Sequence, residues 1–421
     1  MKKILWLCNG APSRAIMLYQ NSNKGGISWI DSLLDYYYRM NNVEFYIFFP
    51  ENNIEDDDIK KDGNIQYHPF KIGKSPHKYY VPLEKKFFES LNKIQPDIIH
   101  IFGTEFPHCL SMMRAVQSLG LNKKAIINIQ GLCSVIEKHY YAFLPFKVIY
   151  KFTFRDFLKQ DNISQQRKKF GMRGEYEREA IKLAYNVVGR TEWDKACIKE
   201  INPDCKYYCC NEMMREVFYK NKWDIQNCEK HSIFITQSYY PLKGFHILLQ
   251  AILKLRTRYP DIKVYTVGNN PITNNRIKED SYSEYIRRMI IQNKMQNQVI
   301  FLKELSGHEI CQQYMNAHVF VLPSSIENSS NSLAEAMLLG VPSVVSDVGG
   351  ARSLFRDRVD GFMYPADEDY MLAYYIGEIF ENDSLALSFS DNSREHASFL
   401  YNEDRILHTM EKIYEEVGHE S

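Results

Sequence analysis

The sequence predicts an α/β protein built from two doubly wound parallel sheets, and three observations lead to that fold class. The 421 residues exceed the size at which a single core keeps growing, so two domains are expected. Short runs rich in branched and aromatic residues alternate with longer stretches of helical periodicity, as in parallel βαβ units. This alternation occurs as two similar series, one in each half of the chain.

The predicted strands are short and apolar. Those of the first half are Ile4–Leu7, Glu44–Phe49, Ile98–Phe102, Ala125–Ile129 and Asn186–Val188. Those of the second half are Ser232–Thr236, Lys263–Val267, Val299–Leu302, Val319–Leu322 and Ser343–Ser346. Helical periodicity follows in segments such as Gly244–Tyr259, Tyr282–Asn293 and His308–Asn316. The pattern lapses near 211–230, so we expect domains at 1–212 and 213–399 and a last helix within about 400–421.

Composition and charge exclude several classes of protein. The 52 basic and 52 acidic residues cancel, which argues against a nucleic-acid partner. The nine cysteines are an odd number without paired metal-ligand spacing, so a reduced, cytoplasmic compartment is expected. No apolar stretch approaches the roughly 18–20 residues of a transmembrane helix. The first apolar run, Ile4–Cys8, is too short for a signal peptide and is interpreted as a buried strand.

Residues 324–342 place two carboxylates, Glu327 and Glu335, at a strand-to-helix turn. Open α/β sheets bind ligands at the carboxyl ends of their strands, and a helix N-terminus there offers free N–H groups to an anion. The segment therefore predicts a site for a charged ligand. An alternative stays open for Glu335, because Ser332 and Glu335 have the spacing of a capping box that only satisfies the helix end.

Another strand-to-helix turn in the same half carries Lys243 and Gly244. A lysine there supplies a point charge to a diphosphate, and a glycine lets the backbone come close. A solvated lysine beside a helix-start glycine is the alternative. Two glycine pairs, Gly25-Gly26 and Gly349-Gly350, follow other strands and permit positive φ and close approach of a phosphate, or form plain loops.

Polar residues also follow the strands of the first half. Glu105 and His108 come after Ile98–Phe102, and their side chains suit general acid-base chemistry or hydrogen bonding to an acceptor hydroxyl. A structural role is the alternative for a single histidine. Arg190 follows Asn186–Val188 and is a candidate anion contact.

Together these motifs resemble the retaining GT-B glycosyltransferases of family 4, in a bacterial polysaccharide-type branch. The Glu-x7-Glu pair, the Lys-Gly turn and the first-domain glycine loop carry the resemblance, which is strongest from Phe234 to Pro365. It implies two facing Rossmann-like domains with a cleft between them, the first on the acceptor side and the second binding the donor. It also implies a last helix that crosses back to the first domain, and neither a metal nor a cofactor.

The resemblance assigns roles to individual residues. Glu335 would hold the ribose of a nucleotide, and Glu327 would touch the transferred sugar during front-face transfer, without acting as a covalent nucleophile. The implied catalytic set is Glu327, Lys243, His108 and Glu105. The implied donor-binding set is Gly25, Gly26, Lys243, Ser238, Glu327, Asn331, Ser332, Leu333, Glu335, Gly268 and Arg190.

The sequence departs from the family pattern at two positions. Ser238 stands where many members have an arginine, which leaves the diphosphate charge to Lys243 and the helix amides. Gln130 stands where many members have a histidine, which leaves the acceptor half of the site less defined.

A basic and aromatic stretch lies between Phe146 and Arg173. Eight lysines and arginines alternate there with phenylalanines and tyrosines, against only Asp156 and Asp161. Such a stretch suits an anionic membrane surface or a lipid-linked acceptor, and a charged face on ordinary helices is the alternative. Asp56-Asp57-Asp58 imitates a metal-binding motif, but its polar surroundings favour a solvated loop.

The leading hypothesis is retaining transfer from a nucleotide-diphosphate sugar, with a UDP-sugar favoured, to a carbohydrate or lipid-linked hydroxyl. Its setting would be cell-surface polysaccharide synthesis, in the cytoplasm or peripherally on the inner face of the plasma membrane. A sugar-nucleotide epimerase and a catalytically silent glycosyltransferase-like scaffold are the alternatives. A dehydrogenase is disfavoured because no Gly-x-Gly-x-x-Gly follows any predicted strand.

Overall fold

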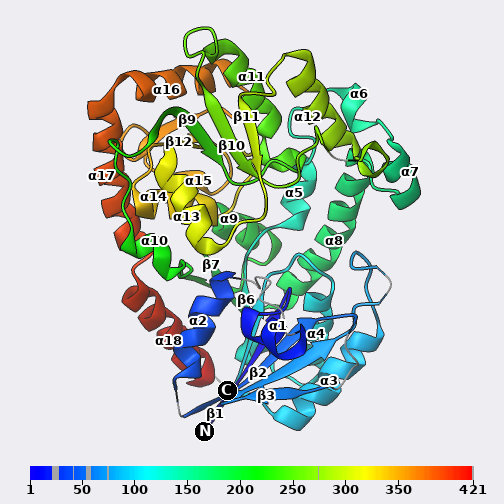
Figure 1. Ribbon diagram of the computed structural model, residues 1–421. Helices are drawn as coiled ribbons and strands as arrows, with labels where there is room; N and C mark the ends of the chain where they lie inside the picture. The colour runs from blue at the N-terminus through cyan, green and yellow to red at the C-terminus, as the bar shows by residue number, and fades with distance from the viewer. Residues whose placement is uncertain (21–27, 41, 54–57, 74, 274, 420–421) are drawn as a thin grey trace. The chain divides into compact units, whose positions relative to one another are not determined.

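The computed structural model describes residues 1–20, 28–40, 42–53, 58–73, 75–273 and 275–419, and the chain divides into two compact units (Figure 1). Unit 1 comprises Met1–Glu137, Lys169–Met213 and Tyr401–Ser421. Unit 2 comprises Lys138–Lys168 and Met214–Leu400. Each unit contains one sheet, and the predicted α/β class with two parallel-sheet domains is confirmed.

The sheet of unit 1 has the strand order β3-β4-β2-β1-β5-β6-β7-β8 and is parallel except for the β3–β4 pair. Its strands are β1 (Lys2–Cys8), β2 (Val43–Pro50), β3 (Lys60–Asp62), β4 (Ile65–Phe70), β5 (Ile98–Phe102), β6 (Ala125–Asn128), β7 (Asn186–Gly189) and β8 (Lys206–Cys209). The helices up to β8 are α1 (Ser13–Gln20), α2 (Ser28–Tyr38), α3 (Pro82–Ile94), α4 (His108–Ser118), η1 (Asn122–Lys124), α5 (Cys133–His139), α6 (Phe146–Ile149), α7 (Phe154–Lys159), α8 (Ile163–Leu183) and α9 (Glu192–Ile201).

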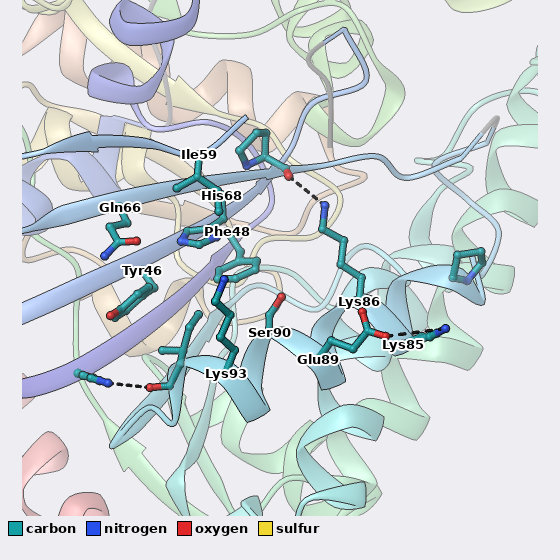
Figure 2. Close-up of a pocket in the computed structure, with 14 residues that line it drawn as sticks. Tyr46, Phe48, Ile59, Gln66, His68, Lys85, Lys86, Glu89, Ser90 and Lys93 are labelled. Atoms are coloured by element: carbon teal, nitrogen blue, oxygen red, sulfur yellow. Dashed lines mark hydrogen bonds and ion pairs between the residues drawn. The ribbon is translucent and has the colours of Figure 1, made fainter. Parts of the chain in front are cut away.

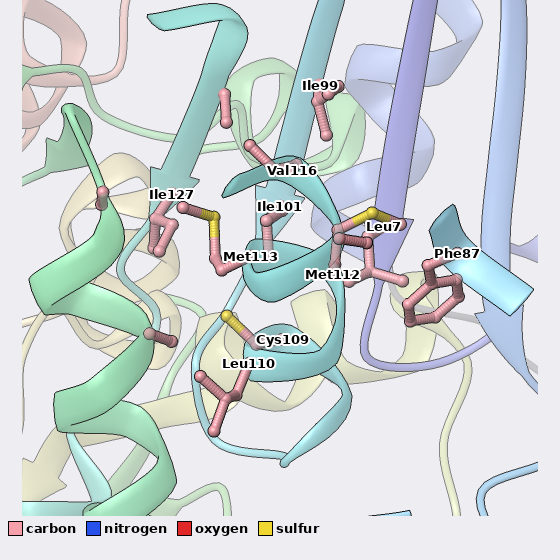
Figure 3. Close-up of a cluster of buried hydrophobic side chains, with 14 of the residues drawn as sticks. Leu7, Phe87, Ile99, Ile101, Cys109, Leu110, Met112, Met113, Val116 and Ile127 are labelled. Carbon is pink, nitrogen blue, oxygen red and sulfur yellow. The ribbon is translucent and has the colours of Figure 1, made fainter. Parts of the chain in front are cut away.

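The strands of this sheet are buried on both faces, so successive residues of one strand enter two different cores. In β1, Leu5 and Leu7 belong to one cluster, whereas Ile4, Trp6 and Cys8 belong to the other. Figure 3 shows the first cluster, in which strand residues meet methionines of α4 and an aromatic ring of α3. This double burial explains why the strands read as continuous apolar runs in the sequence.

The opposite core of unit 1 is closed by the last helix, α18 (Glu403–His419). Its Tyr414 hydroxyl accepts a hydrogen bond from Trp6 Nε1 at 3.0 Å and lies 2.8 Å from His100 Nδ1. Met410, together with other apolar residues of α18, packs against the same cluster. The C-terminal helix therefore packs on the sheet formed by the N-terminal part of the chain.

Unit 2 has a parallel sheet with the order β11-β10-β9-β12-β13-β14. Its strands are β9 (Glu229–Ile235), β10 (Lys263–Val267), β11 (Val299–Leu302), β12 (Ala317–Leu322), β13 (Ser343–Ser346) and β14 (Gly361–Tyr364). The helices from β8 to α18 are α10 (Glu216–Lys220), η2 (Pro241–Lys243), α11 (Phe245–Leu255), η3 (Arg276–Lys278), α12 (Ser281–Gln292), α13 (Gly307–Asn316), α14 (Asn331–Leu339), α15 (Ala351–Leu354), α16 (Asp369–Glu381) and α17 (Asp383–Leu400). None of the described helices is long and apolar enough to cross a bilayer.

The segment Lys138–Lys168 differs from the expected division of the chain, which placed it in the first domain. It packs with unit 2 because several polar groups tie it there. His246 Nε2 donates to the Ala142 carbonyl at 2.7 Å, and the Ser281 N–H donates to the buried Asp156 carboxylate at 2.9 Å. These partners are distant in sequence, so no local sequence pattern predicts their contacts.

All ten predicted strands are present, with ends shifted by a few residues. Four further strands, β3, β4, β8 and β14, were not predicted. Three of these, β3, β8 and β14, are edge strands, and an edge strand needs fewer apolar residues. The fourth, β4, lies next to the edge strand β3 and contains His68 and Pro69.

Candidate functional site

A cavity of about 1160 Å³ lies within unit 2 at the carboxyl ends of three adjacent strands. Thr236 follows β9, Gly268 follows β10 and Lys303 follows β11, and all three line it. Ser332, in the first turn of α14, lines the same cavity. Parallel strands and a helix N-terminus thus converge where ligands of open α/β sheets bind.

Five residues of the predicted donor-binding set line this cavity. They are Ser238, Gly268, Asn331, Ser332 and Glu335. They come from three separate turns of the sheet, so the structure brings together side chains that lie up to almost a hundred positions apart. Leu333 is buried in the first turn of α14, and its N–H is bonded to the helix cap at 3.4 Å.

The start of α14 decides between the two interpretations of Glu335. The N-cap residue is Ser330, whose hydroxyl accepts from the Leu333 N–H, so Ser332 is inside the helix. The Ser332 hydroxyl instead accepts from Thr236 Oγ1 at 3.1 Å. Glu335 therefore takes no part in a capping box, and its carboxylate serves another purpose.

Glu335 forms an ion pair with Arg215, whose Nη2 lies 2.6 Å from Glu335 Oε1. Burial raises the pKa of Glu335, and the guanidinium of Arg215 offsets part of that rise. Tyr314, at 3.4 Å, adds a weak hydrogen bond. Both members of the ion pair line the cavity. A carboxylate held in this way can accept hydrogen bonds from hydroxyl groups of a ligand.

Lys243 and Glu327 form a second ion pair, with 2.5 Å between Nζ and Oε1. The Ser324 hydroxyl donates to the same carboxylate oxygen at 2.7 Å. Burial acts to lower the pKa of Lys243, but the Glu327 carboxylate and Tyr240 outweigh it and hold the pKa above its ordinary value. Lys243 is therefore a fixed positive charge beside Glu327, the acid that is predicted to contact the transferred sugar.

Backbone packing explains the glycines at these turns. Gly244 has φ of 65°, and a Cβ there would lie 1.7 Å from the Pro323 carbonyl oxygen. Gly349 has φ of 50°, and a Cβ there would lie 2.0 Å from the carbonyl oxygen of Glu327. Both positions require glycine because neighbouring loops come into direct contact. The two glycines thereby fix the loop that carries Glu327.

The predicted residues Glu105 and His108 lie in a hydrogen-bonded network within unit 1. Asn9 joins them, with its Nδ2 donating to Glu105 at 2.6 Å and its Oδ1 2.9 Å from His108 Nε2. Glu105 also accepts from the Gly131 N–H at 2.9 Å. Burial lowers the pKa of His108 to about 3, so this ring is neutral at neutral pH. The network holds the loops after β5 and β6 together.

Arg190 is likewise committed to partners in unit 1. It lies 2.8 Å from Glu212 and donates to the Ile129 carbonyl at 3.1 Å. Gln130, which stands at the position of the expected histidine, donates to the same Glu212 carboxylate. Gly25 and Gly26 lie outside the described residues.

Sequence reasoning missed three residues of these arrangements. Arg215 and Asn9 gave no signal, since each acts on a partner far along the chain. Lys303 could have been found, because it directly follows a predicted strand and therefore belongs to the same sheet edge as Ser238.

A second hollow, of about 640 Å³, lies in unit 1 beside α3 (Figure 2). Lysines of α3 and Lys3 surround it, and Tyr46, Phe48 and His68 of β2 and β4 line it. None of the predicted site residues that the structure describes lines this hollow. Within the described ranges, no group of three or more His, Cys, Asp or Glu residues could hold a metal ion.

Residues 218–396 match the family model "Glycosyl transferases group 1". This region contains the cavity except for Arg155 and Arg215, and both ion-paired acids, Glu327 and Glu335. The match confirms the resemblance to GT-B glycosyltransferases that the spacing of the two acids indicated.

Two curated relatives and one solved structure illustrate what the chain is similar to. An uncharacterized glycosyltransferase of Methanocaldococcus jannaschii is 24% identical over 235 residues, which are 56% of this chain and 53% of that protein. The capsular polysaccharide biosynthesis glycosyltransferase CapM of Staphylococcus aureus is 26% identical over 41% of this chain and 42% of its own length. The matched region therefore spans about half of these relatives or less.

The structure of Anabaena Alr3699/HepE in complex with UDP-glucose has a TM-score of 0.66 and 16% identity, and the match covers 99% of both chains. At this identity the likeness establishes the fold alone, and that fold extends over the whole chain. Residues 218–396 are thus similar to glycosyltransferases of group 1, and the fold of the chain is similar to that of the HepE structure.

Proposed function

We propose that the protein transfers a sugar from a nucleotide-diphosphate sugar to a hydroxyl of a glycan or lipid-linked glycan, with retention of configuration. The observation that carries the proposal is the cavity at the strand ends of unit 2, where Glu335 is held by Arg215 at the start of α14. A nucleoside diphosphate needs a hydrogen-bond acceptor for the hydroxyls of its ribose and a positive charge near its phosphates. The cavity and its neighbouring turn offer both.

Each donor group has a proposed partner. Glu335 accepts hydrogen bonds from the ribose hydroxyls, while free N–H groups at the start of α14, near Ser332, face the diphosphate. Lys243 and Lys303 supply positive charge. Ser238 lines the cavity at the position where many family members have an arginine. Glu327 positions the transferred sugar.

In the proposed reaction, the bond between the anomeric carbon and the diphosphate oxygen breaks. The acceptor oxygen bonds to that carbon on the same face, and its proton passes to the departing diphosphate. Positive charge near the leaving group stabilises the negative charge that develops there. Lys243 meets that requirement, because its raised pKa keeps it protonated throughout.

UDP-glucose in the HepE structure supports a uridine nucleotide as donor, and the name of CapM supports a role in polysaccharide synthesis. We assign Glu105 and His108 to positioning of the first-unit loops on the acceptor side, since each is hydrogen-bonded to Asn9. Arg190 is assigned the same kind of role through Glu212.

The proposal is tested by measuring nucleotide binding and sugar transfer together. UDP should raise the melting temperature more than GDP or ADP does, and Lys243→Ala should abolish that difference. The matched control is Lys254→Ala, which removes another ion-paired lysine of unit 2, 2.7 Å from Asp369, outside the cavity. Transfer to a glycan acceptor should yield a product with the anomeric configuration of the donor.

Two outcomes favour the alternatives. Donor turnover without an acceptor would indicate an epimerase. A melting temperature that no nucleotide raises would indicate a silent scaffold and would contradict the proposal.

A further inference from the structure

Residues 143–160 of unit 2 form a segment that exposes many apolar side chains, and we call it the aromatic segment. Its most exposed rings are Phe146, at 77%, and Phe157, at 71%. The complete set of exposed large apolar side chains in it is Phe143, Phe146, Tyr150, Phe152, Phe154, Phe157 and Leu158. So dense an exposed apolar surface marks an interaction site.

The aromatic segment is firmly held, so its exposed rings are not those of a loose chain. Its inner side chains, Leu144, Val148 and Ile149, are buried. The buried Asp156 carboxylate closes a capping box with Thr153 at the start of α7 and also accepts from the backbone of α12. These contacts present the outer rings on a fixed platform.

A further ion pair joins the aromatic segment to α12. Lys151 lies 2.6 Å from Glu284, and its carbonyl accepts from Asn162 at 3.2 Å. Hydrogen bonds and ion pairs thus hold the aromatic segment before α6, between α6 and α7 and after α7.

The charge on the outer surface of the aromatic segment is positive. Arg155 is neutralised by Asp156 and Asp161, at 3.1 and 3.3 Å. The remaining exposed charges between 143 and 160 belong to Lys147 and Lys159. Exposed rings combined with lysines match the boundary of a bilayer that contains anionic lipid, where aromatic rings lie at headgroup depth.

We propose that the aromatic segment binds the surface of an anionic lipid bilayer, with Phe146, Phe157 and Leu158 inserted among the headgroups. A second copy of the chain fits less well, since a symmetric contact would bring the same two lysines of each copy together. The inference does not depend on the transfer reaction, because, of residues 143–160, only Arg155 lines the cavity, and neither the exposed rings nor Lys147 and Lys159 do.

The test is cosedimentation of the full-length protein with vesicles of phosphatidylcholine, with or without phosphatidylglycerol. Binding is expected only to vesicles with phosphatidylglycerol and should decrease with added salt. Phe157→Ser with Leu158→Ser should abolish it. Lys147→Glu with Lys159→Glu should weaken it by more than about tenfold, since each basic residue near an anionic surface contributes about 1 kcal/mol.

Matched controls lie on other exposed surfaces. Tyr370→Ser with Tyr374→Ser removes two exposed rings of α16, and Lys182→Glu with Lys412→Glu reverses two exposed lysines of unit 1. Both should bind vesicles as the unmodified protein does. Unchanged melting temperatures establish that all four variants are folded.

A separate readout reports insertion directly. Phe157→Trp should show a blue shift of its fluorescence on adding phosphatidylglycerol vesicles. Failure of the unmodified protein to bind these vesicles, or equal binding by the variants of the aromatic segment, would overturn the proposal. A dimer in ultracentrifugation that Phe157→Ser with Leu158→Ser converts to a monomer would also overturn it and identify a second copy as the partner. Loss of vesicle binding with sugar transfer to a soluble acceptor intact would leave the proposed function standing.

Discussion

At the scale of the residue, the candidate donor site depends on how two acids with largely covered side chains are paired. Glu335 is held by Arg215 and Glu327 by Lys243, at 2.6 and 2.5 Å. A buried carboxylate without a partner would be protonated or would destabilise the fold. The guanidinium of Arg215 therefore favours the ionised form of Glu335 against the effect of burial.

Arg215 is a positioning residue, and its removal should alter the pH dependence of nucleotide binding. The guanidinium lowers the pKa of Glu335 against the effect of burial, so in Arg215→Ala that pKa rises. Glu335 then becomes protonated at a higher pH, and UDP affinity should begin to fall at a correspondingly higher pH than in the unmodified protein.

Titration calorimetry of UDP binding at a series of pH values measures this shift. Arg215→Lys, which restores the charge, should return the profile most of the way. Glu335→Gln should bind weakly at every pH. A uniform loss of affinity in Arg215→Ala, with no shift along the pH axis, would mean that Arg215 only supports the fold.

At the scale of the element, α18 shows how a helix far along the chain completes an earlier core. The hydroxyl of Tyr414 accepts a hydrogen bond from Trp6 and lies 2.8 Å from His100 Nδ1, and both partners are in strands of unit 1. Stacking of Tyr414 on Tyr37, with 6.0 Å between ring centroids, adds contact with α2. A single side chain thus joins three elements.

Tyr414→Phe should destabilise the protein by about 1–3 kcal/mol, because it leaves the buried Trp6 N–H and a His100 nitrogen unpaired while keeping the ring. Urea denaturation measures the loss. Tyr374→Phe, which removes an exposed hydroxyl, is the control and should cost less than about 0.5 kcal/mol. Equal effects of the two changes would contradict the role given to the Tyr414 hydroxyl.

At the scale of the whole molecule, both units bury neutral histidines. Burial lowers the pKa of His100 and His108 in unit 1 to about 3, and that of His246 and His318 in unit 2 to about 4. In the unfolded chain their pKa is 6.5. Below that value the unfolded state binds more protons than the folded state.

Stability should therefore fall as the pH is lowered from about 6.5 towards 4, with each histidine contributing about 1.4 kcal/mol per pH unit at most. Urea denaturation at pH 7 and pH 5 measures the slope. His318→Phe keeps the stacking on Phe380 and should make the slope shallower. The exposed His408, changed to Gln, should leave it unaltered. A slope insensitive to His318→Phe would contradict the assignment.

Much of the fold could be predicted because its signals are local. Strands buried on both faces are continuous apolar runs, and helices show their own period, so all ten predicted strands appear. The edge strands β3 and β8 were missed because an edge tolerates polar residues. In the candidate site, Glu335 was predicted from its strand-to-helix turn and Ser238 from the resemblance to the family, and both line the cavity.

The sequence by itself determined the two series of strands, the turns that carry Lys243 and Glu327, and the spacing of the two acids. Only the tertiary structure decided that Glu335 pairs with Arg215, 120 residues away, rather than with the helix end. It also decided that residues 138–168 pack with unit 2 and turn their rings outward. The physical reason is that periodicity and turn chemistry act between near neighbours, whereas the partner of a charge and the exposed side of a ring depend on segments far apart in the chain.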